Sequence, residues 1–397
     1  MIARRATPCA TRRGFLATSA AAAVAAWLGP AADAEIVLGM VPFLDEGPFP
    51  VEKTVGAGLG RRRSLDLSTL SRETLLTPQD RFFVRTGCPD PLPPSSWKVR
   101  IHGLVEAPGQ IAAEELTREA VPLGAHLLEC AGNSRAAHFG FMSAASWTGV
   151  PLQRLLQRVR PRTTATQVLV SGFDEHTTGD PGSVPGASWI FGREQVRESG
   201  AFLATRMNGA PLTMDHGYPL RLVVPGWYGC TAIKWVNEIA LLDDDAVATD
   251  HMREYAGRTH QPPAGPDDER LERNGRLLEG PRRARDFQPA TIDPAALPVR
   301  VDKVRVRGKT SYRIAGILWG STVPVRALRI RLNPVLGFAP VDHIGSRLAG
   351  AWTLWSHTFP PPAPGRYRIE LALEDPALRA RRLDAGFYTR EIEITGG

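Results

Sequence analysis

The run Leu127–Arg135, LLECAGNSR, contains Cys130, the residue whose type and setting best suit chemistry. A short apolar stretch leads to this cysteine, a Gly-Asn pair after it predicts a turn, and Arg135 follows five positions later. A thiol on a turn beside a cation favours the thiolate form. A thiolate is either a nucleophile or a ligand for a soft metal.

Three interpretations of Cys130 follow from this setting. A nucleophile requires a histidine base nearby, and His126 and His138 are close in sequence, but no recognised nucleophile motif surrounds them. A buried structural thiol is the ordinary state of a free cysteine. The other features of the chain favour the third interpretation, a metal ligand.

The remaining cysteines are Cys9, Cys88 and Cys230. Cys9 lies in a predicted leader, which leaves an odd number, so at least one thiol is unpaired or coordinates something. Cys88 and Cys230 are either a disulfide, as an oxidising compartment allows, or two separate buried thiols, which we favour. The chain has no Cys-x-x-Cys-His motif for covalent haem and no Cys-x-x-Cys zinc spacing.

Residues 1–34 are expected to be an export signal. Arg12 and Arg13 precede Gly-Phe-Leu, the stretch Ala20–Leu28 is apolar, and Ala32–Ala34 offers a small-residue cleavage site. The paired arginines favour a twin-arginine signal over an ordinary secretory one, so the chain would fold with its cofactor before export to the periplasm. No segment reaches the ~18 consecutive apolar residues of a membrane span, so no stable membrane insertion is expected.

The formal net charge is +7, of which the four arginines and one aspartate of residues 1–34 contribute +3. The remaining +4 suits attraction of small anions. The arginines are scattered rather than arranged in a basic stripe, so nucleic-acid binding is not expected.

A length of about 360 residues after the signal predicts two domains. Residues 35–79, rich in proline and glycine, are expected to be an N-terminal arm, and residues 80–250 an α+β domain. Within it, hydrophobic spacing predicts a helix and several strands. The predicted helix is 151–159, and the predicted strands are 97–105, 167–172, 220–226, 233–236 and 239–242.

Residues 251–290 are charged and contain Pro262-Pro263, which predicts a surface linker. Residues 291–397 contain several short runs in which apolar and polar residues alternate, which predicts an immunoglobulin-like β-sandwich. Taken alone, such a sandwich also fits a non-catalytic periplasmic binding module. The alternating runs are 299–301, 304–306, 328–332 and 367–371.

Five segments in order resemble the sulfite oxidase family of molybdopterin enzymes. They are FFVR at 82–85, CAGNSR at 130–135, MNGAPL at 207–212, DHGYPLRLVVPG at 215–226, and Gly229 with IKW at 233–235. The resemblance covers nearly the whole chain after the signal. It implies a molybdopterin-binding domain of mixed sheets and helices, followed by a sandwich that forms a homodimer.

The resemblance implies that Cys130 is the sole protein ligand of molybdenum, beside the two dithiolene sulfurs of the pterin. His216, Arg221 and Lys234 would hold the pterin phosphate, for which a guanidinium fork is well suited. The plainer alternatives are a turn histidine, a surface arginine and a solvated strand lysine. Further cofactor contacts are implied for Phe83, Arg85, Asp174, Ala232 and Ile233.

The catalytic residues implied by the resemblance surround the open face of the metal. Arg85 and Arg135 would attract an anion, Trp147 would form a wall, and Tyr255 would donate a hydrogen bond or pass protons. Surface arginines, a core tryptophan and a loop-anchoring tyrosine are the alternatives. A third cation from the sandwich is implied but not assigned among Arg326, Arg329, Arg331 and Arg347.

One pair of residues departs from the pattern. Animal and plant members of the family follow the first arginine with Asn-His, whereas Thr86-Gly87 follow Arg85 here. The implied reaction is oxidation of sulfite to sulfate with a periplasmic cytochrome c as electron acceptor. Because Gly87 offers no side chain to the pterin, a sulfane sulfur compound or a sulfoxide stays open as the substrate.

Overall fold

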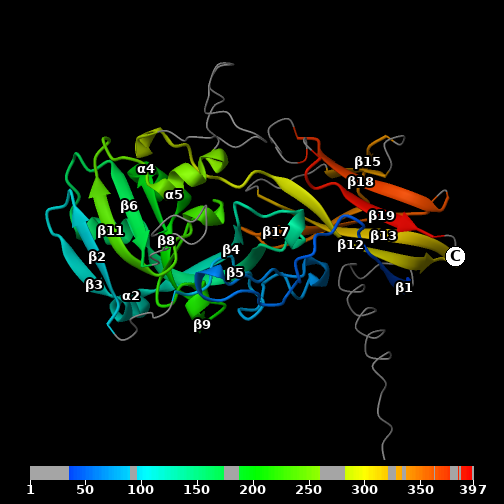
Figure 1. Ribbon diagram of the computed structural model, residues 1–397, viewed down its shortest axis with the longest axis horizontal. Coiled ribbons are helices and arrows are strands. Elements are labelled where there is room, and N and C mark those ends of the chain that lie inside the picture. Colours follow the sequence, from blue (N-terminus) through cyan, green and yellow to red (C-terminus); the bar gives the residue numbers. More distant parts are fainter. Residues whose placement is uncertain are drawn as a thin grey trace, which may run out of the picture.

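The computed structural model comprises an α+β domain at one end of an elongated molecule and a β-sandwich at the other (Figure 1). The predicted signal, Asp174, Arg326 and most of the predicted linker lie outside the described residues. The structure describes residues 35–89, 96–173, 187–259, 282–320, 328–332, 337–361, 363–375, 383 and 386–395.

The α+β domain contains two five-stranded sheets. Short helices flank them: α2 (Ala113–Glu119), α3 (Leu152–Arg158) and α4 (Arg193–Ser199). In spatial order the first sheet is β3 (Gly109–Ala112), β2 (Lys98–Gly103), β11 (Val236–Leu242), β6 (Gln167–Gly172) and β7 (Ser188–Gly192). The second is β10 (Arg221–Val223), β8 (Phe202–Met207), β5 (Met142–Pro151) and β4 (Val121–Glu129), with β9 (Ala210–Pro211) paired to β8.

The predicted strands and helix of this domain are confirmed, with one exception. In β2, Val99 and Ile101 are buried while their neighbours face outward, as a period of two requires. The segments 233–236 and 239–242 were both expected to be strand, but β11 begins at Val236, so residues 233–235 lie outside it. It pairs parallel to β2 and antiparallel to β6, so both of its edges are hydrogen-bonded.

The C-terminal domain is a sandwich of two antiparallel sheets, which confirms the predicted fold class. Large apolar side chains such as Ile314, Trp355 and Ile369 form the core between the sheets. The first sheet is β1 (Ile36–Val41), β12 (Ala295–Val306), β13 (Lys309–Trp319), β17 (Trp352–Phe359) and β16 (His343–Arg347). The second is β15 (Ala339–Pro340), β14 (Leu328–Leu332), β18 (Gly365–Leu373) and β19 (Arg390–Ile394).

The N-terminal arm belongs to both domains. Its first strand, β1, pairs antiparallel with β12 and completes an edge of the sandwich, which the sequence did not indicate. Farther along, Arg63 forms a β-bridge with Val84 of the α+β domain. The arm therefore connects the two ends of the molecule instead of only wrapping one of them (Figure 1).

The start and end of the predicted surface linker are packed against the α+β domain. Helix α5 (Asp250–Glu254) buries Met252, and Ala256 and Ala284 are buried as well. The prediction of a surface segment is therefore wrong for these residues. Residues 260–281 lie outside the described part of the chain.

The sandwich supports β4, the strand that leads to Cys130. The indole of Trp319 donates a 2.8 Å hydrogen bond to Glu129 at the end of β4, and both side chains are buried. The Leu127 N–H donates to the Gly350 carbonyl oxygen at 3.0 Å.

Across the described residues, no helix has the length and apolar character needed to cross a bilayer.

Candidate functional site

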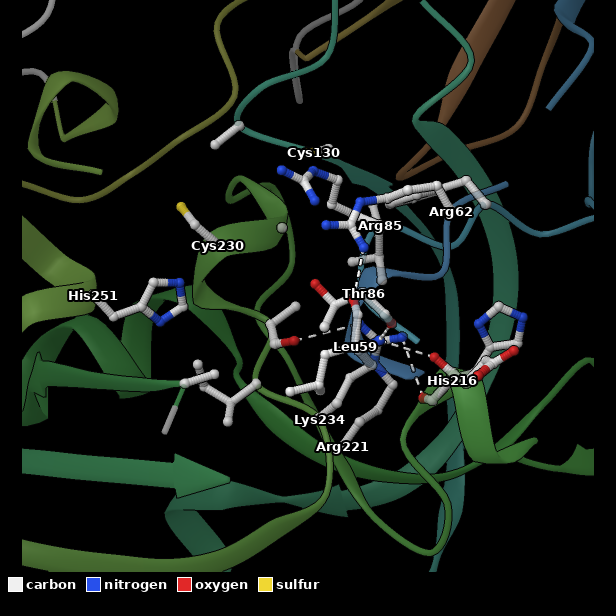
Figure 2. Close-up of a pocket in the computed structure, with 18 of the residues that line it drawn as sticks. Leu59, Arg62, Arg85, Thr86, Cys130, His216, Arg221, Cys230, Lys234 and His251 are labelled. Atoms are coloured by element: carbon white, nitrogen blue, oxygen red, sulfur yellow. Dashed lines mark hydrogen bonds between the residues drawn. The ribbon is translucent and has the colours of Figure 1, made fainter. Parts of the chain in front are cut away.

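A cavity of about 250 Å³ opens at the end of β4, and several separate parts of the chain form its wall (Figure 2). We call it the Cys130 cavity. Its lining residues are Leu59, Gly60, Arg62, Phe82, Phe83, Arg85, Thr86, Leu128, Cys130, Ala131, Ala187, Asp215, His216, Arg221, Gly229, Cys230, Ala232, Ile233, Lys234, His251, Glu254 and Tyr255.

Cys130 lies on the predicted turn directly after β4. Its N–H donates to the Phe141 carbonyl oxygen at 2.9 Å, and its carbonyl accepts from the Asn133 N–H at 2.9 Å. The Gly132 N–H points at the sulfur from 3.4 Å. Burial raises the pKa of the thiol, and neither the Arg85 charge nor the Gly132 N–H reverses this shift. The expected thiolate is therefore disfavoured in the protein alone, and a bound cation would be needed to stabilise it.

Arg221 is buried in the cavity wall at the start of β10. Its Nη atoms donate long hydrogen bonds to the carbonyl oxygens of His216 (3.3 Å) and Ala232 (3.4 Å). Its Nε is buried without a hydrogen-bond partner among the described residues, which include no carboxylate ion-paired to it. Burial lowers the pKa of Arg221 to about 9, so the group is still charged at neutral pH. A buried cation held in this way is suited to binding an anion.

His216 lies on the 3₁₀ turn Met214–His216 and is almost fully buried. Burial and the nearby charges of Arg221 and Lys234 lower its pKa to about 3, so it is neutral. Its Nε2 faces the Gln79 carbonyl oxygen at 3.1 Å and must therefore carry the proton. This leaves Nδ1 as the acceptor nitrogen of the ring.

Lys234 reaches across the cavity wall. Its ammonium donates to the carbonyl oxygens of Thr86 and Asp215, the latter at 2.9 Å, and lies 4.5 Å from the Trp235 ring centre. Burial tends to raise the pKa of the Asp215 carboxyl, but hydrogen bonds from the Cys88 N–H and from Arg61 outweigh burial and lower it. Asp215 is therefore a fixed negative charge that holds this side of the cavity together.

Five further predicted site residues differ in whether they line the Cys130 cavity. Phe83, Ala232 and Ile233 line the cavity, as does Arg85, an exposed side chain for which the described residues provide no hydrogen bond or ion pair. Trp147 does not line it: the ring is fully buried behind the wall, with the Arg221 guanidinium 5.4 Å from the ring centre. The sixth, Asp174, is outside the described residues.

The structure does not bring Arg135 to the cavity, which corrects the prediction. Its guanidinium forms an ion pair with Asp45 of the arm at 3.0 Å. It also donates to the carbonyl oxygens of Phe387 and Thr389, at 3.1 and 2.8 Å. The turn after Cys130 reverses the chain, so a spacing of five residues directs Arg135 towards the sandwich and the arm.

Tyr255 does line the cavity, at the end of α5. Burial, with a contribution from the Glu254 charge, raises the pKa of its phenol, so Tyr255 stays protonated and can donate a hydrogen bond. Its ring packs edge-on against His251, with 5.1 Å between the ring centres. Glu254 and His251 line the cavity as well, although no motif in the sequence indicated either residue.

Arg258 is a cation near Cys130 that the sequence analysis missed, because it falls in the predicted linker. Its Nε donates to the Ala131 carbonyl oxygen at 2.8 Å, and its guanidinium lies 5.5 Å from the Tyr228 ring centre. Its positive charge tends to lower the pKa of both Cys130 and Cys230. Arg258 thus lies between the turns that carry the two cysteines.

All three described cysteines are free thiols, so Cys88 and Cys230 do not form a disulfide. Cys230 is buried and lines the cavity, while Cys88 is half-buried. Of the arginines considered for the third cation, Arg329 and Arg331 are ion-paired to Glu374 and Glu370 within the sandwich. Neither they nor Arg347 line the Cys130 cavity.

Comparison with known proteins relates most of the cavity wall to molybdopterin enzymes. The model of the oxidoreductase molybdopterin binding domain matches residues 86–249. Sulfite oxidase of Gallus gallus is 30% identical over 222 residues, which cover 47% of this chain and 44% of that protein. Residues 86–249 therefore match a molybdopterin-binding domain that is similar to that of sulfite oxidase.

Other relatives agree on this domain and differ in their reactions. Mitochondrial sulfite oxidase of Rattus norvegicus is 30% identical over 207 residues (47% of this chain, 37% of that protein). An NADPH nitrate reductase of Aspergillus niger is 32% identical over 194 residues (45% and 22%). The chain thus spans less than half the length of these relatives. The sulfane dehydrogenase SoxCD of Paracoccus pantotrophus matches in structure with a TM-score of 0.63 at 21% identity, over 89% of this chain and 90% of that one, which shows a shared fold.

The residues of the molybdopterin-binding domain fit molybdenum-molybdopterin. Cys130 offers a sulfur to a metal that is otherwise held by sulfur. The buried Arg221, whose Nε lacks a partner among the described residues, would gain one from the pterin phosphate, with Lys234 close by. The observation that decides the fit is the placement of this thiol and this guanidinium in the wall of one cavity (Figure 2).

Proposed function

We propose that the protein is a molybdopterin-dependent oxidoreductase that oxidises sulfite to sulfate. Sulfite and water would yield sulfate, two protons and two electrons. Molybdenum-molybdopterin supplies the two-electron oxygen-atom transfer when it is bound. The proposal is supported above all by one observation: the buried thiol of Cys130 faces a cavity whose wall also carries Arg85, Arg221 and Lys234.

The protein's own groups have separate roles in this proposal. Cys130 ligates the metal, and its buried setting excludes water from the bond. Arg221 binds the pterin phosphate, with Lys234 beside it. Arg85 is the exposed cation at the cavity, where it attracts a sulfur oxyanion. Tyr255, kept protonated by burial, donates a hydrogen bond from its hydroxyl.

Metal and pterin analysis, combined with sulfite-dependent reduction of cytochrome c, tests the proposal. We expect about one molybdenum per chain in the wild-type protein. Cys130→Ala should lose the metal–sulfur signal of the protein thiol in X-ray absorption, whereas Cys230→Ala, which removes the other cavity thiol, should keep it. If the signal were lost in the Cys230 variant and kept in the Cys130 variant, Cys230 would be the metal ligand, and the proposal would be contradicted.

A different sulfur substrate is the second candidate, and the charge of the cavity supports it. Arg135 is directed away, and Glu254 brings a carboxylate to the wall beside Tyr255. A wall that lacks Arg135 and carries an acid is less suited to a free dianion and better suited to a neutral sulfoxide or a sulfane sulfur. Turnover of methionine sulfoxide with a reduced dye, in the absence of sulfite turnover, would favour this candidate.

The electron acceptor and the location complete the proposal. The chain has no covalent haem motif, so a separate cytochrome c is proposed to take the electrons one at a time. We also propose export to the periplasm through the twin-arginine signal and a homodimer formed by the sandwich. Cell fractionation with an Arg12→Lys, Arg13→Lys signal variant, and sedimentation of the purified protein, test these two points.

A further inference from the structure

The segment Gly58–Arg62 of the N-terminal arm forms one wall of the Cys130 cavity. Leu59, Gly60 and Arg62 all line it, although they lie outside the matched domain, residues 86–249. The arm is held there by paired backbone hydrogen bonds. Arg62 exchanges two with Val55, and Arg63 exchanges two with Val84, each 2.8 or 2.9 Å long. The contact between the arm and the cavity is therefore fixed by backbone hydrogen bonds.

Gly87 is the residue that admits the arm. A Cβ atom at this position would lie 2.3 Å from the Gly58 carbonyl oxygen and 2.5 Å from the Arg61 Cβ. No other residue type fits without moving the arm backbone. The departure at Thr86-Gly87 thus has a structural consequence, because the arm occupies the space that a histidine side chain at position 87 would fill.

The arm meets the cavity on the side of His216. Arg61 donates two hydrogen bonds to the Asp215 carboxylate, at 2.9 and 3.0 Å, and Asp215 directly precedes His216. Lys234 donates to the Asp215 carbonyl oxygen from the same side. The arm is therefore fixed next to the residues suited to a phosphate.

Arg62 is positioned by its own arm. Its Nη1 donates to the carbonyl oxygens of Leu59 (2.7 Å) and Arg61 (3.0 Å), which fixes the guanidinium in the wall. Figure 2 draws Arg62 and Arg85 on one side of Thr86, and Lys234 and Arg221 on the other. A fixed guanidinium in a cationic cavity is suited to binding an oxyanion.

We propose that Arg62 is a cofactor-binding residue and that the arm segment Gly58–Arg62 closes the molybdopterin cavity. The inference rests on the proposed function, because it takes molybdopterin as the occupant. The ligand chemistry is an oxyanion, and because the neighbouring Arg61 ties the arm to Asp215, which directly precedes His216, we take the anionic pterin rather than the substrate as the ligand. Removal of the Arg62 charge should then release the cofactor, whereas a substrate-binding arginine would change only the KM.

The test compares Arg62→Gln with a matched variant, Arg72→Gln. Arg72 is an exposed arm residue whose Nε donates to Ser346 at 2.6 Å. Molybdenum is measured by mass spectrometry, and pterin by the fluorescence of its oxidised form after denaturation, at intervals during dialysis. Arg62→Gln should release pterin at least about tenfold faster than the wild-type protein, the factor expected for one charge-assisted hydrogen bond. Arg72→Gln should release it at the wild-type rate.

A second variant, Gly87→Ala, tests the arm without changing a charge. Displacement of the arm should expose the bonds after Arg61 and Arg62 to trypsin, and pterin should be lost as in Arg62→Gln. Equal pterin release in Arg62→Gln and wild type, or a rise in KM alone, would overturn the inference. Wild-type protein that binds pterin but leaves sulfite unoxidised would overturn the sulfite proposal and leave the arm inference to be decided by these release rates.

Discussion

Replacing Arg221 with methionine should stabilise the metal-free protein while abolishing retention of the cofactor. Arg221 is 6% exposed and has two long hydrogen bonds to carbonyl oxygens, and the described residues provide no carboxylate to pair with it. Methionine has a similar length and keeps the contact with Trp147. The substitution therefore removes a buried charge without opening a large cavity.

The magnitude follows from the lowered pKa of Arg221. Burial moves it from 12.5 to about 9, and each unit corresponds to ~1.36 kcal/mol, so burial of the charge costs on the order of 5 kcal/mol. The two carbonyl oxygens lose their donors in the variant, at about 1 kcal/mol each. The metal-free Arg221→Met protein should thus be about 2–3 kcal/mol more stable at pH 7.

The pH dependence provides a second check on the same reasoning. Between pH 9 and 12.5 the folded protein has released the Arg221 proton while the unfolded chain keeps it, so stability rises with pH in this window. The advantage of the methionine variant should therefore shrink above pH 9, by ~1.36 kcal/mol per unit. Urea unfolding of both metal-free proteins at pH 7 and pH 10 measures the difference.

Arg154→Met, an exposed substitution on α3, is the matched control and should change stability by less than ~0.5 kcal/mol. In the same preparations, Arg221→Met should contain little pterin. A metal-free Arg221→Met protein that is less stable than the wild type would refute the reasoning, because the charge would then contribute to the fold.

Three further outcomes are expected. Arg135→Gln should lower the free energy of unfolding by about 1 kcal/mol, because it loses the ion pair with Asp45, and should leave the KM for sulfite unchanged in steady-state assays. Gly350→Ala should destabilise by more than ~2 kcal/mol in urea, because its φ is +77° and a Cβ would lie 2.3 Å from the Ala125 carbonyl oxygen. The metal-free protein should lose stability as the pH falls from 6.5 to 4, because the folded His216, with a pKa of about 3, is uncharged there while the unfolded histidine is protonated. In His216→Gln this loss should be smaller, by the contribution of about one proton.

Each of these has a result that would contradict it. A higher KM for sulfite in the Arg135 variant would place that cation at the substrate after all. Wild-type stability in the Gly350 variant would mean that the sandwich is not seated on β4. An unchanged slope below pH 6.5 in the His216 variant would mean that the folded histidine takes up its proton at an ordinary pH.

The sequence determined the resemblance to molybdopterin enzymes, the fold class and the local elements around Cys130. Hydrophobic spacing of two or three to four residues depends only on neighbours along the chain, so β2, α3 and β6 were predictable. The short motif at 215–226 placed His216 and Arg221 in one wall, because a turn and a three-residue strand leave little freedom between them.

Tertiary structure decided which distant charges share the cavity. Arg258 is far from Cys130 along the chain, yet it donates to the carbonyl oxygen of the adjoining Ala131. Arg135 is only five residues from Cys130, yet it forms an ion pair with Asp45 of the arm. The arm wall likewise depends on one missing side chain at Gly87. Such contacts join segments tens to hundreds of residues apart, and their partners are chosen by packing, which no local spacing encodes.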